Sequence, residues 1–586
     1  YALVASIRGR STLLEHNQRT AMDLDLARTP FSRYGSYFVF SYLDRPKTRQ
    51  PGLYLRTVRG GNPTHDLLRV ELLVDGIPAP FTINANTTIL TLEAGPASVS
   101  FCIAEQTAIR IKGNGAGVRF THAPIAAFDN VFLVDSATAE VNDWSSGIRL
   151  AFSVPTGSLN ADAPWQNPRC THMVIDCLPD SGDGVLDCVV EEFKTTRPLR
   201  NRPCPTFDEC TKSVAAEFRK WAKRSPKVSM VHENAAELAQ YLTWSSVVAP
   251  SGRMNRPAML MSKNWMSNIW CWDACFNAMA LAYRNPELAW DQFMLFFDHQ
   301  DQNGALPDSL NDVSIVWNFT KPPVHGWALR WMMERSDFIT RRELKQVYAP
   351  LAAWTNWWMT ARDDDGDGVP QYNHGNDSGW DNATVFDVGL PVESPDLSAY
   401  LVIQMDVLSE IADALGRGRD ARRWKKRADT LLGKMISHSW RDGQFVAPRS
   451  GQHDVAEGDC LLPFVPIVLG KRLPKEQRKA LVAGVLRDGR FLTEHGLATE
   501  SPASAKFDPK GYWRGPIWAP ATLLIVDGLV ALGERGAARQ ISKRFCDMVL
   551  AEGMAENFHP HNGKGLCDPA YTWTASVFQI LAHEYV

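Results

Sequence analysis

The sequence has no apolar run close to the roughly 20 residues that a helix needs to cross a bilayer. Its most apolar stretch, Ile517 to Leu532, is interrupted by Asp527 and is typical of a buried helix in a globular protein. We therefore expect no membrane-spanning segment and no membrane partner.

An excess of one charge is also missing. The 62 lysine and arginine residues balance 65 aspartate and glutamate residues, for a formal net charge of -3. A surface that binds nucleic acid needs clustered basic residues. The one dense basic run, Arg417–Arg427 (RGRDARRWKKR), has no aromatic and basic counterpart elsewhere, and we interpret it as the solvated face of a helix. No nucleic-acid partner is expected.

Short metal-binding motifs are absent as well. Neither a CxxC pair nor an HExxH motif occurs, which argues against a motif-based zinc site. The 11 cysteines are an odd number, and five of them lie between Cys170 and Cys210. They would form disulfides in an exported protein and stay buried free thiols inside the cell, so both interpretations remain open.

A secretory signal is not recognisable either. The N-terminal segment YALVASIRGRSTLLEH lacks the basic start, apolar centre and small-residue cleavage site of a signal peptide. The cytoplasm is thus slightly favoured, while a processed start at Tyr1 would allow export. The N-glycosylation motifs matter only for an exported chain; they begin at Asn86, Asn318, Asn376 and Asn382.

A chain of 586 residues is too long for one ordinary core, and its two parts differ in periodicity. In residues 1–225, short alternating or apolar runs are separated by Gly, Pro, Asn and Asp clusters, for example at Ser36–Ser41, Leu67–Val74 and Thr88–Leu92. This pattern predicts an antiparallel β-sandwich. The run Gly113–Gly117 (GNGAG) lacks the Lys-Ser/Thr of a phosphate-binding loop, and we interpret it as a turn.

Residues 226–586 are predicted to be helical. Leucine and isoleucine recur from Leu397 to Leu415 at steps of 4, 7, 3 and 4, which lines one face of a helix. About a dozen such segments begin near residues 235, 272, 286, 322, 341, 394, 418, 457, 474, 516, 534 and 569. Sequential pairs of helices suit a toroid of six hairpins, although an irregular helical array fits the count nearly as well.

Tryptophan is scarce in the first part and abundant in the second, where 18 of the 20 tryptophans follow residue 220. Many stand beside Gly, Asn and Asp in loop-like segments: Trp265, Trp270, Trp272, Trp380, Trp513 and Trp518. An indole face can stack on a pyranose ring while carboxylates and amides bind its hydroxyls. The group therefore favours a sugar site, although each single tryptophan could equally plug an end of the helical domain.

Glycoside hydrolysis requires two carboxyl groups, one as acid and one ionised, about 6.5–9.5 Å apart in an inverting enzyme. Two acids on different loops across a cleft meet this requirement more readily than two on one helical turn. Asp381 stands beside Trp380, whose ring could raise its pKa, and Glu556 follows an apparent helix. From the residues alone, Asp377 and Asp387 compete with Asp381 as candidates, and Glu552 competes with Glu556.

Between residues 260 and 580, the series WCWDACFNA, QNGALPD, YNHGNDSGWDNA, GYWRGPIW and AENFHP resembles the catalytic domain of glycoside hydrolase family 63. The resemblance implies an (α/α)6 barrel preceded by a β-sandwich, and inverting hydrolysis of α-linked sugars. It implies Asp381 as general acid and Glu556 as general base. It also implies that the sugar subsite and its rim are lined by Trp270, Trp272, Asp273, Asn303, Asp308, Trp380, Trp513 and Arg514.

A calcium loop is a further hypothesis. Asp363, Asp365 and Asp367 alternate before Gly368, as at the start of a calcium loop, but the twelfth position holds His374 where such loops use Glu. Such a calcium ion would be structural and would hold the loop that carries Asp381. An ordinary acidic turn explains the run as well.

We therefore expect a multidomain protein with an inverting glycosidase that cleaves α-glucosidic bonds of small oligosaccharides or glucosides without a redox cofactor. Relatives of this kind also act on mannosides and on glycosides of glycerate, so an α-mannoside, α-rhamnoside or glycosylglycerate substrate is an alternative. A basic residue such as Arg514 would suit an anionic aglycone, unless it pairs with a carboxylate. A non-catalytic carbohydrate-binding protein is the rival from another class, and the oligomeric state stays open.

Overall fold

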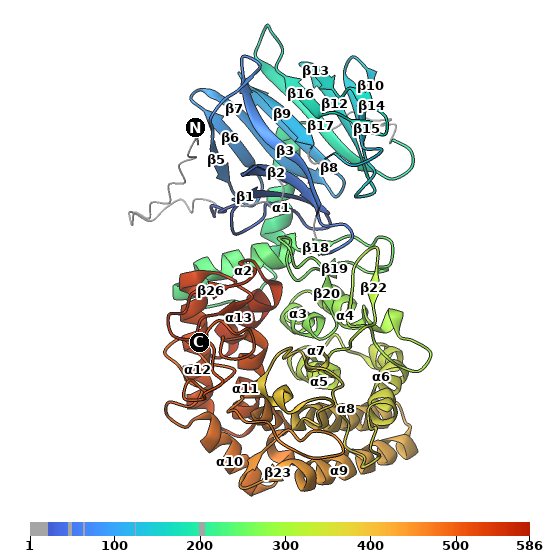
Figure 1. Ribbon diagram of the computed structural model, residues 1–586, viewed down its shortest axis with the longest axis vertical. Helices are drawn as coiled ribbons and strands as arrows, with labels where there is room; N and C mark the ends of the chain where they lie inside the picture. Colours follow the sequence, from blue (N-terminus) through green and yellow to red (C-terminus); the bar gives the residue numbers. More distant parts are fainter. Residues whose placement is uncertain (1–21, 45–49, 63–64, 123–124, 198–204) are drawn as a thin grey trace. The chain divides into compact units, whose positions relative to one another are not determined.

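The computed structural model describes residues 22–44, 50–62, 65–122, 125–197 and 205–586 (Figure 1). The N-terminal segment that was searched for a secretory pattern lies outside these residues, as does Cys204. Contacts divide the chain into two compact units. The first takes the described residues up to Lys223 with Trp244–Ala249 and Lys263–Ser267, and the second takes the remainder up to Val586.

The first unit contains two antiparallel sheets. One has the order β1-β2-β3-β9-β16-β13, with β4 beside β3, and the other has the order β10-β11-β12-β17-β8-β7-β6-β5. The strands of the first sheet are β1 (Phe38–Leu43), β2 (Gly52–Thr57), β3 (His65–Val74), β4 (Ile77–Pro78), β9 (Gly117–His122), β13 (Ser158–Asp162) and β16 (Met173–Leu178). Those of the second are β5 (Thr82–Ala85), β6 (Leu90–Ala94), β7 (Ala97–Glu105), β8 (Ala108–Asn114), β10 (Asn130–Asp135), β11 (Thr138–Asp143), β12 (Ile148–Thr156) and β17 (Val185–Phe193). A small pair joins β14 (Trp165–Gln166) to β15 (Arg169–Cys170).

The two sheets pack face to face, which confirms the predicted β-sandwich. Buried and partly exposed residues alternate along β11 and β16, because successive side chains of a strand point to opposite faces. Rings from the two sheets meet in the core, with Phe120 5.1 Å from Phe152 and Phe40 5.2 Å from Phe101 between centroids. The GNGAG run is the turn between β8 and β9, where Gly115 has a φ of 62°.

The expectation of β-structure up to residue 225 was wrong at its end, because α1 (Phe207–Ala222) is a helix. Thr206 and Glu209 form a reciprocal capping box at its start, and one face is buried along Phe207, Cys210, Val214, Phe218 and Trp221. The threonine–glutamate spacing followed by apolar residues three and four apart was the signal that the sequence analysis did not use.

The second unit is built from helices and short connecting strands. Its helices are α2 (Glu233–Ser245), α3 (Asp273–Leu281), α4 (Pro286–Met294), α5 (His325–Arg335), α6 (Arg341–Ala361), α7 (Gly375–Ser378), α8 (Pro395–Ala414), α9 (Gly418–Ser439), α10 (Lys475–Val485), α11 (Ala519–Ala531), α12 (Arg535–Glu552) and α13 (Thr572–Glu584). Its 3-10 segments are η1 (Met230–His232), η2 (Phe297–His299), η3 (Thr384–Val388) and η4 (Leu462–Arg472). Strand β18 (Val247–Val248) belongs to the first unit. The short strands of the second unit are β19 (Ala258–Met259), β20 (Ile269–Trp270), β21 (Ser309–Leu310), β22 (Ile315–Val316), β23 (Trp440–Arg441), β24 (Gln444–Phe445), β25 (Asn557–Phe558) and β26 (Gly565–Leu566).

The inner helices close into a ring, as an (α/α)6 barrel requires. In the order α3, α5, α8, η4, α11 and α13 each segment contacts the next, and α13 contacts α3 (Figure 1). Asn277 of α3 closes the ring through hydrogen bonds of 3.3 Å from its amide to Thr572 and 2.7 Å from Ser576 of α13. The toroid, and not an irregular array, is therefore the fold of the second unit.

Sequence periodicity separates inner from outer helices. The inner α11 is apolar around most of its circumference, whereas the outer α9 buries one stripe that includes Trp424 and Met435 and exposes the basic run. The helix expected near residue 457 is instead the 3-10 segment η4, because Pro463 and Pro466 lack the amide hydrogens of an α-helix.

Within the described part of the chain, no helix combines the length and the apolarity that a membrane span requires. Its ten described cysteines are all free thiols, and Cys177 and Cys188 lie 3.8 Å apart between sulfurs in the β-sandwich core. The structure thus favours the thiol interpretation over disulfides for these positions.

Candidate active site

The candidate residues gather where the inner helices begin. Asp273 is the first residue of α3, Lys321 precedes α5, Asp381 precedes α8, and Glu556 precedes α13. Of these residues, Asp273 stands in the first turn of its helix, where unpaired amide groups and a partial positive charge favour a carboxylate, whereas Asp381 and Glu556 lie in the loops that lead to their helices. Segments that are remote in the sequence therefore deliver acidic side chains to one end of the barrel.

Lys321 stands at the centre of one half of this site. Its ammonium lies 3.2 Å from Oδ1 of Asp308 and 3.9 Å from Oδ1 of Asp381, and it donates a 2.8 Å hydrogen bond to the backbone oxygen of Asn376. Burial lowers the pKa of Lys321, but the charges of Asp381, Asp308 and Asp273 outweigh this and raise it. Lys321 is therefore a fixed positive charge among three carboxyl groups.

Burial dominates the acidity of these three carboxyl groups. It raises the pKa of Asp273 well above its ordinary value, and it raises the pKa of Asp308 and Asp381 while Lys321 opposes the effect in each case. A carboxyl group with a raised pKa can hold a proton near neutral pH, as a general acid must.

A tight local frame positions Asp381. Helix α7 ends at Ser378. The next residue, Gly379, has a φ of 74°, and a Cβ atom there would come within 2.5 Å of the Trp272 ring. The amide of Asn376 faces both carboxyl oxygens; with its nitrogen turned toward Asp381 it donates at 2.8 Å to Oδ1 and at 3.1 Å to Oδ2. Rotating the amide would let its oxygen accept from a protonated Asp381, so it can serve both protonation states.

Glu556 is held by a strand and a tyrosine. Its side chain is 3% exposed, its backbone amide donates to the carbonyl of Asp568 at 2.7 Å, and the Tyr512 hydroxyl donates to Oε1 at 3.0 Å. Burial, aided by the charge of Asp568, raises the pKa of Glu556 to about 7 although the Tyr512 hydrogen bond lowers it. Tyr512 has a φ of 64°, a left-handed conformation that is uncommon for a large side chain and often marks a functional site.

One residue connects the two carboxyl-bearing segments. Asn382 accepts a 3.0 Å hydrogen bond from the amide of Trp513 and donates one of 3.0 Å to the carbonyl of Gly511, on either side of Tyr512. The charge of Asp381 also contributes to the raised pKa of Glu556. Asp381 thus lies close enough to influence the charge of Glu556, although 175 positions separate them in the chain.

Comparison with known proteins identifies the family. The model of the mannosylglycerate hydrolase MGH1-like glycoside hydrolase domain matches residues 266–574, a range that contains both carboxyl-bearing segments. The chain belongs to this glycoside hydrolase family. It is a glycosidase, and the resemblance to glycoside hydrolase family 63 is confirmed.

Two curated relatives of this MGH1-like glycosidase illustrate the level of similarity. Mannosylglycerate hydrolase MGH1 of Selaginella moellendorffii is 21% identical over 397 residues, which covers 53% of this chain and 78% of the relative. Glucosylglycerate hydrolase of Mycolicibacterium hassiacum is 22% identical over 411 residues, covering 53% of this chain and 90% of the relative.

Solved structures share the fold of the MGH1-like glycosidase. A GH63 mannosylglycerate hydrolase from Thermus thermophilus, in complex with glucose, has a TM-score of 0.50 at 20% identity and covers 60% of this chain and 99% of its own. A bacterial glucoamylase complexed with acarbose has a TM-score of 0.61 at 9% identity and covers 97% of this chain and 95% of its own. The second match extends over both the β-sandwich and the barrel.

In the glycosidase, most of the predicted tryptophans are almost fully buried against other rings. Trp272, Trp380, Trp513 and Trp518 are at most 2% exposed, and the rings of Trp513 and Trp518 stack at 4.0 Å with 5° between their planes. They pack on one another and so brace the loops that carry Asp381 and Tyr512. Trp270, which pairs with Ser309 in a short strand next to Asp308, is only half-buried and keeps part of its surface accessible.

Arg514 and Asn303, which were predicted to line the sugar subsite, have structural partners. Arg514 donates to the carbonyl of Asn382 at 2.8 Å and forms a bidentate ion pair with Asp387. Asn303 lies in an exposed turn, where its amide donates to Asp301 at 3.3 Å. Arg514 therefore fixes the loop after Asp381, and Asn303 shapes a turn.

The competing acids of the glycosidase are also structural. Asp377 is buried and accepts hydrogen bonds from the amides of Thr320, Asn373 and His374 at 3.0 to 3.2 Å. Asp387 pairs with Arg514, and Glu552 accepts from the amide of Gly565 at 3.4 Å. These contacts leave Asp381 and Glu556 as the better placed pair.

The predicted calcium loop does bring its carboxylates together. Ligand atoms of Asp363, Asp365 and Asp367 lie within 4.8 Å of one another, and the turn is held by hydrogen bonds such as the 2.7 Å bond from the Val369 amide to Asp367. His374, at the twelfth position, instead caps α7 by accepting from the Asn376 amide. Calcium binding at this loop remains a hypothesis.

Three residues of the site were missed from the sequence. Lys321 was not considered, because a single lysine before Pro322 and Pro323 carries no motif of its own. Tyr512 stands inside the quoted GYWRGPIW segment, but its neighbours Trp513 and Arg514 were chosen as ligands in its place. Asp568, which is buried in the segment before α13, contributes to the raised pKa of Glu556. No motif in the sequence indicated it.

Proposed function

We propose that this glycosidase hydrolyses the α-glycosidic bond of a small glycoside with inversion, with Asp381 as general acid and Glu556 as general base. Asp381 gives its proton to the glycosidic oxygen as that bond breaks. Glu556 takes a proton from a water molecule that attacks the anomeric carbon from the opposite face. The proposal requires the two carboxyl groups to stand about 6.5–9.5 Å apart with room for one water.

The single observation that carries the assignment is the bridge through Asn382. Asn382 follows Asp381 and is hydrogen-bonded to Gly511 and Trp513. Tyr512, between these two residues, donates to Glu556. The two loops that contain Asn382 and Tyr512 therefore set the positions of both acids. The raised pKa values of Asp381 and Glu556 support acid–base chemistry near neutral pH.

The proposed substrate is a glycoside of glycerate or a similar small acid. Relatives named as mannosylglycerate and glucosylglycerate hydrolases support this class.

A neutral α-glucoside is the second candidate, and the ion pairs of Lys321 and Arg514 favour it. Arg514 is engaged with Asp387, and Lys321 with Asp308 and Asp381, so neither is available to an anionic aglycone. The two candidates differ in the aglycone, which is an acid such as glycerate in the first and a neutral group in the second.

Matched substrates separate these candidates. We expect α-glucosylglycerate or α-mannosylglycerate to exceed the corresponding glycerol glycoside in kcat/KM by about tenfold, the effect of one charge-assisted contact. A higher kcat/KM for the glycerol glycoside or for an aryl α-glucoside would favour the neutral class, and an aryl α-rhamnoside would test the remaining sugar.

Variants test the acid and base. D381N and E556Q should each lower kcat by about 100-fold or more, while D413N and E476Q, on exposed helical surfaces, should not. Proton NMR of the first-formed sugar should show the β-anomer. Release of the α-anomer, or full activity of either active-site variant, would contradict the mechanism.

A further inference from the structure

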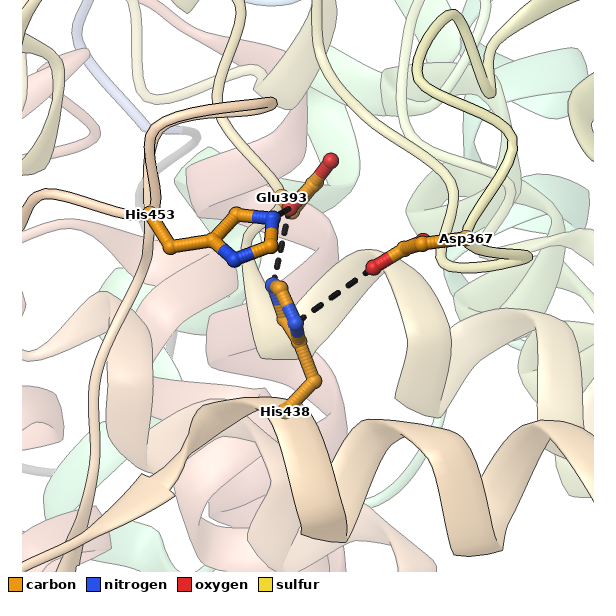
Figure 2. Close-up of side chains that lie close together, drawn as sticks. All are labelled: Asp367, Glu393, His438 and His453. Atoms are coloured by element: carbon orange, nitrogen blue, oxygen red, sulfur yellow. Dashed lines mark ion pairs between the residues drawn. The ribbon is translucent and has the colours of Figure 1, made fainter.

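A second cluster of ligating side chains lies away from the acid–base pair. It contains Asp367 in the loop after α6, Glu393 just before α8, His438 in the last turn of α9, and His453 in the loop after β24 (Figure 2). One ligand atom from each of the four residues lies within 4.8 Å of the others. Four separate chain segments therefore converge on one point.

Glu393 indicates that this convergence serves a ligand. Its side chain is fully buried, at 0% exposure, and neither carboxylate oxygen has a hydrogen-bond partner. A buried carboxylate without donors is costly unless a cation neutralises it. The site thus contains an acceptor directed into the cluster that the protein's own hydrogen bonds leave unsatisfied.

The histidines approach Glu393 without forming hydrogen bonds to it. Nε2 of His438 lies 2.8 Å and Nε2 of His453 3.8 Å from Oε2 of Glu393, yet both nitrogens lack a hydrogen-bond partner. Nδ1 of His438 lies 3.5 Å from Oδ2 of Asp367 (Figure 2). Nε2 of His453 also lies 3.5 Å from Oδ2 of Asp365. Close approaches of ligating atoms that lack hydrogen-bond geometry are compatible with coordination of one common ion.

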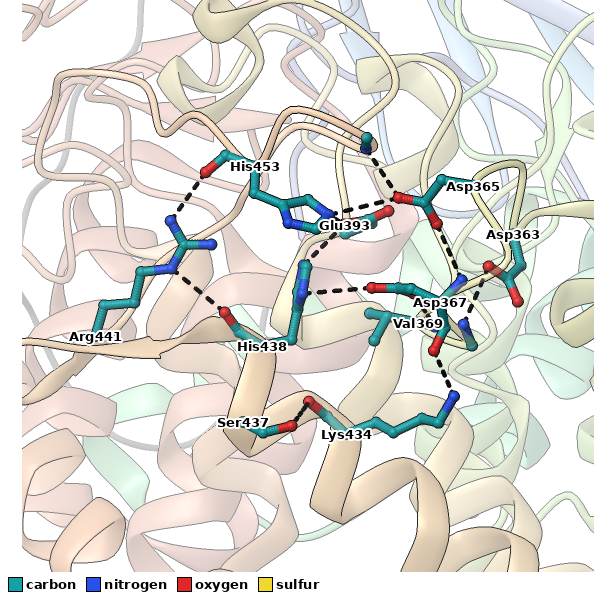
Figure 3. A network of polar contacts seen from close by, with 12 residues as sticks. Asp363, Asp365, Asp367, Val369, Glu393, Lys434, Ser437, His438, Arg441 and His453 are labelled. Atoms are coloured by element: carbon teal, nitrogen blue, oxygen red, sulfur yellow. Dashed lines mark hydrogen bonds and ion pairs between the residues drawn. The ribbon is translucent and has the colours of Figure 1, made fainter.

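The surrounding backbone presents the two imidazoles. Arg441 donates a 2.9 Å hydrogen bond to the carbonyl of His453 and a 3.4 Å bond to that of His438 (Figure 3). His453 has a φ of 59°, a conformation that few non-glycine residues adopt. Two histidine-bearing segments are therefore fixed by one arginine and one unusual backbone turn.

We propose that Asp367, Glu393, His438 and His453 bind one divalent transition-metal cation of the zinc class. Two carboxylates balance the two positive charges of the ion, and two neutral imidazoles favour zinc over calcium, which prefers an all-oxygen shell. The positions 367, 393, 438 and 453 are too far apart in the sequence to form a short motif, so the absence of CxxC and HExxH does not exclude the site.

The proposed ion has a structural role close to the Asp381 loop. The chain runs from Asp367 to Tyr372, whose backbone exchanges hydrogen bonds of 2.8 and 2.9 Å with Val392, the residue before Glu393. The ion would link this base of the loop to the end of α9. Nothing in the acid–base chemistry depends on it, so the proposal stands independently of the proposed function.

The buried cluster of His122, Asp129 and Asp143 in the β-sandwich provides a contrast. There both ring nitrogens of His122 have partners, the Leu67 carbonyl at 2.7 Å and Asp129 at 3.2 Å, and Asp129 also accepts from the amide of Ala126. These groups satisfy one another, so we assign no ion to them.

The test measures metal content of the untagged full chain. After treatment with a chelator and dialysis against Zn²⁺, mass spectrometry should find one zinc per chain, and titration with ZnCl₂ should raise the thermal midpoint. The double variant H438Q/H453Q should lose both effects, and the single variant H453Q, whose side chain is 40% exposed in the parent, should weaken them without loss of folding. H172Q and H561Q, at exposed positions, serve as matched controls.

Three results would overturn the proposal. One is the absence of zinc in the folded parent chain beyond the level of a metal-free blank. Another is equal zinc retention in H438Q/H453Q and the parent. The third is stoichiometric Ca²⁺ binding that D363N abolishes and H438Q/H453Q leaves intact, which would assign the ion to the aspartate loop instead.

Discussion

Tyr512 donates a 3.0 Å hydrogen bond to Oε1 of Glu556 from a backbone in the left-handed region. Its two neighbours in the chain are bonded to Asn382, which follows Asp381. One strained residue is thereby bound to Glu556 and held, through its neighbours, by the segment that carries Asp381. Its hydroxyl is the contact through which the acidity of Glu556 can be tested.

Removal of this hydroxyl should shift the pH dependence. In Y512F the hydrogen bond that lowers the pKa of Glu556 is lost, so the pKa should rise by about one unit, equivalent to roughly 1.4 kcal/mol. The acidic limb of kcat/KM should move to higher pH by the same amount, while the rate on the plateau changes less. An unmoved limb would mean that Glu556 is not the group that titrates in it.

The pH profile of the parent enzyme distinguishes the roles of the two acids. With burial raising the pKa of Glu556 to about 7, a general base at this position is active only when ionised. We therefore expect kcat/KM to increase as pH rises through about 7. If activity instead decreases through this value, and E556Q removes that decrease, Glu556 acts as the acid and the assignment is reversed.

The same carboxyl group should make stability depend on pH. Its pKa is about 7 in the folded chain against an ordinary value of 4.5, so between these values the unfolded chain loses its proton first. Folding stability should therefore decrease as pH rises through this window, by about 3 kcal/mol when complete.

E556Q, which cannot ionise, should escape this loss. Its thermal midpoint should exceed that of the parent at pH 8 and match it near pH 4, and E476Q at an exposed position should show no such difference. A gap between E556Q and parent that is the same at both pH values would refute an ionisation effect.

The pair of Arg514 and Asp387 can be tested as a structural support of the Asp381 loop. If both only hold the loop, R514K and D387N should each lower kcat/KM by a similar factor, and the double variant should be little worse than either. The loss should be equal for glycerate and glycerol glycosides. A selective rise in KM for the glycerate substrate in R514K alone would show that Arg514 contacts the aglycone.

The sequence by itself determined the order of a β part before a helical part and the approximate starts of the helices, whereas it favoured the six-hairpin toroid over an irregular array only through the family resemblance. Period-two runs became β1, β3 and β6, and helices begin within a few residues of the predicted starts, because side-chain periodicity reflects which face is buried. Local motifs also indicated the segments of Asp381 and Glu556. Two local elements differ from the expectation. The capped helix α1 lies in a region that was assigned to strands, and the segment with two prolines is the 3-10 segment η4 instead of an α-helix.

Only the tertiary structure decided what each side chain contacts. Trp380 and Trp513 look like sugar platforms in a list of residues, yet both are buried against other rings, and Arg514 is bound to Asp387. Lys321 became visible only once the barrel placed it beside Asp308, and Glu393 only once His438 and His453 approached it. Periodicity encodes burial along one segment, whereas charge compensation and metal ligation depend on distances between segments that only the closed ring of helices fixes.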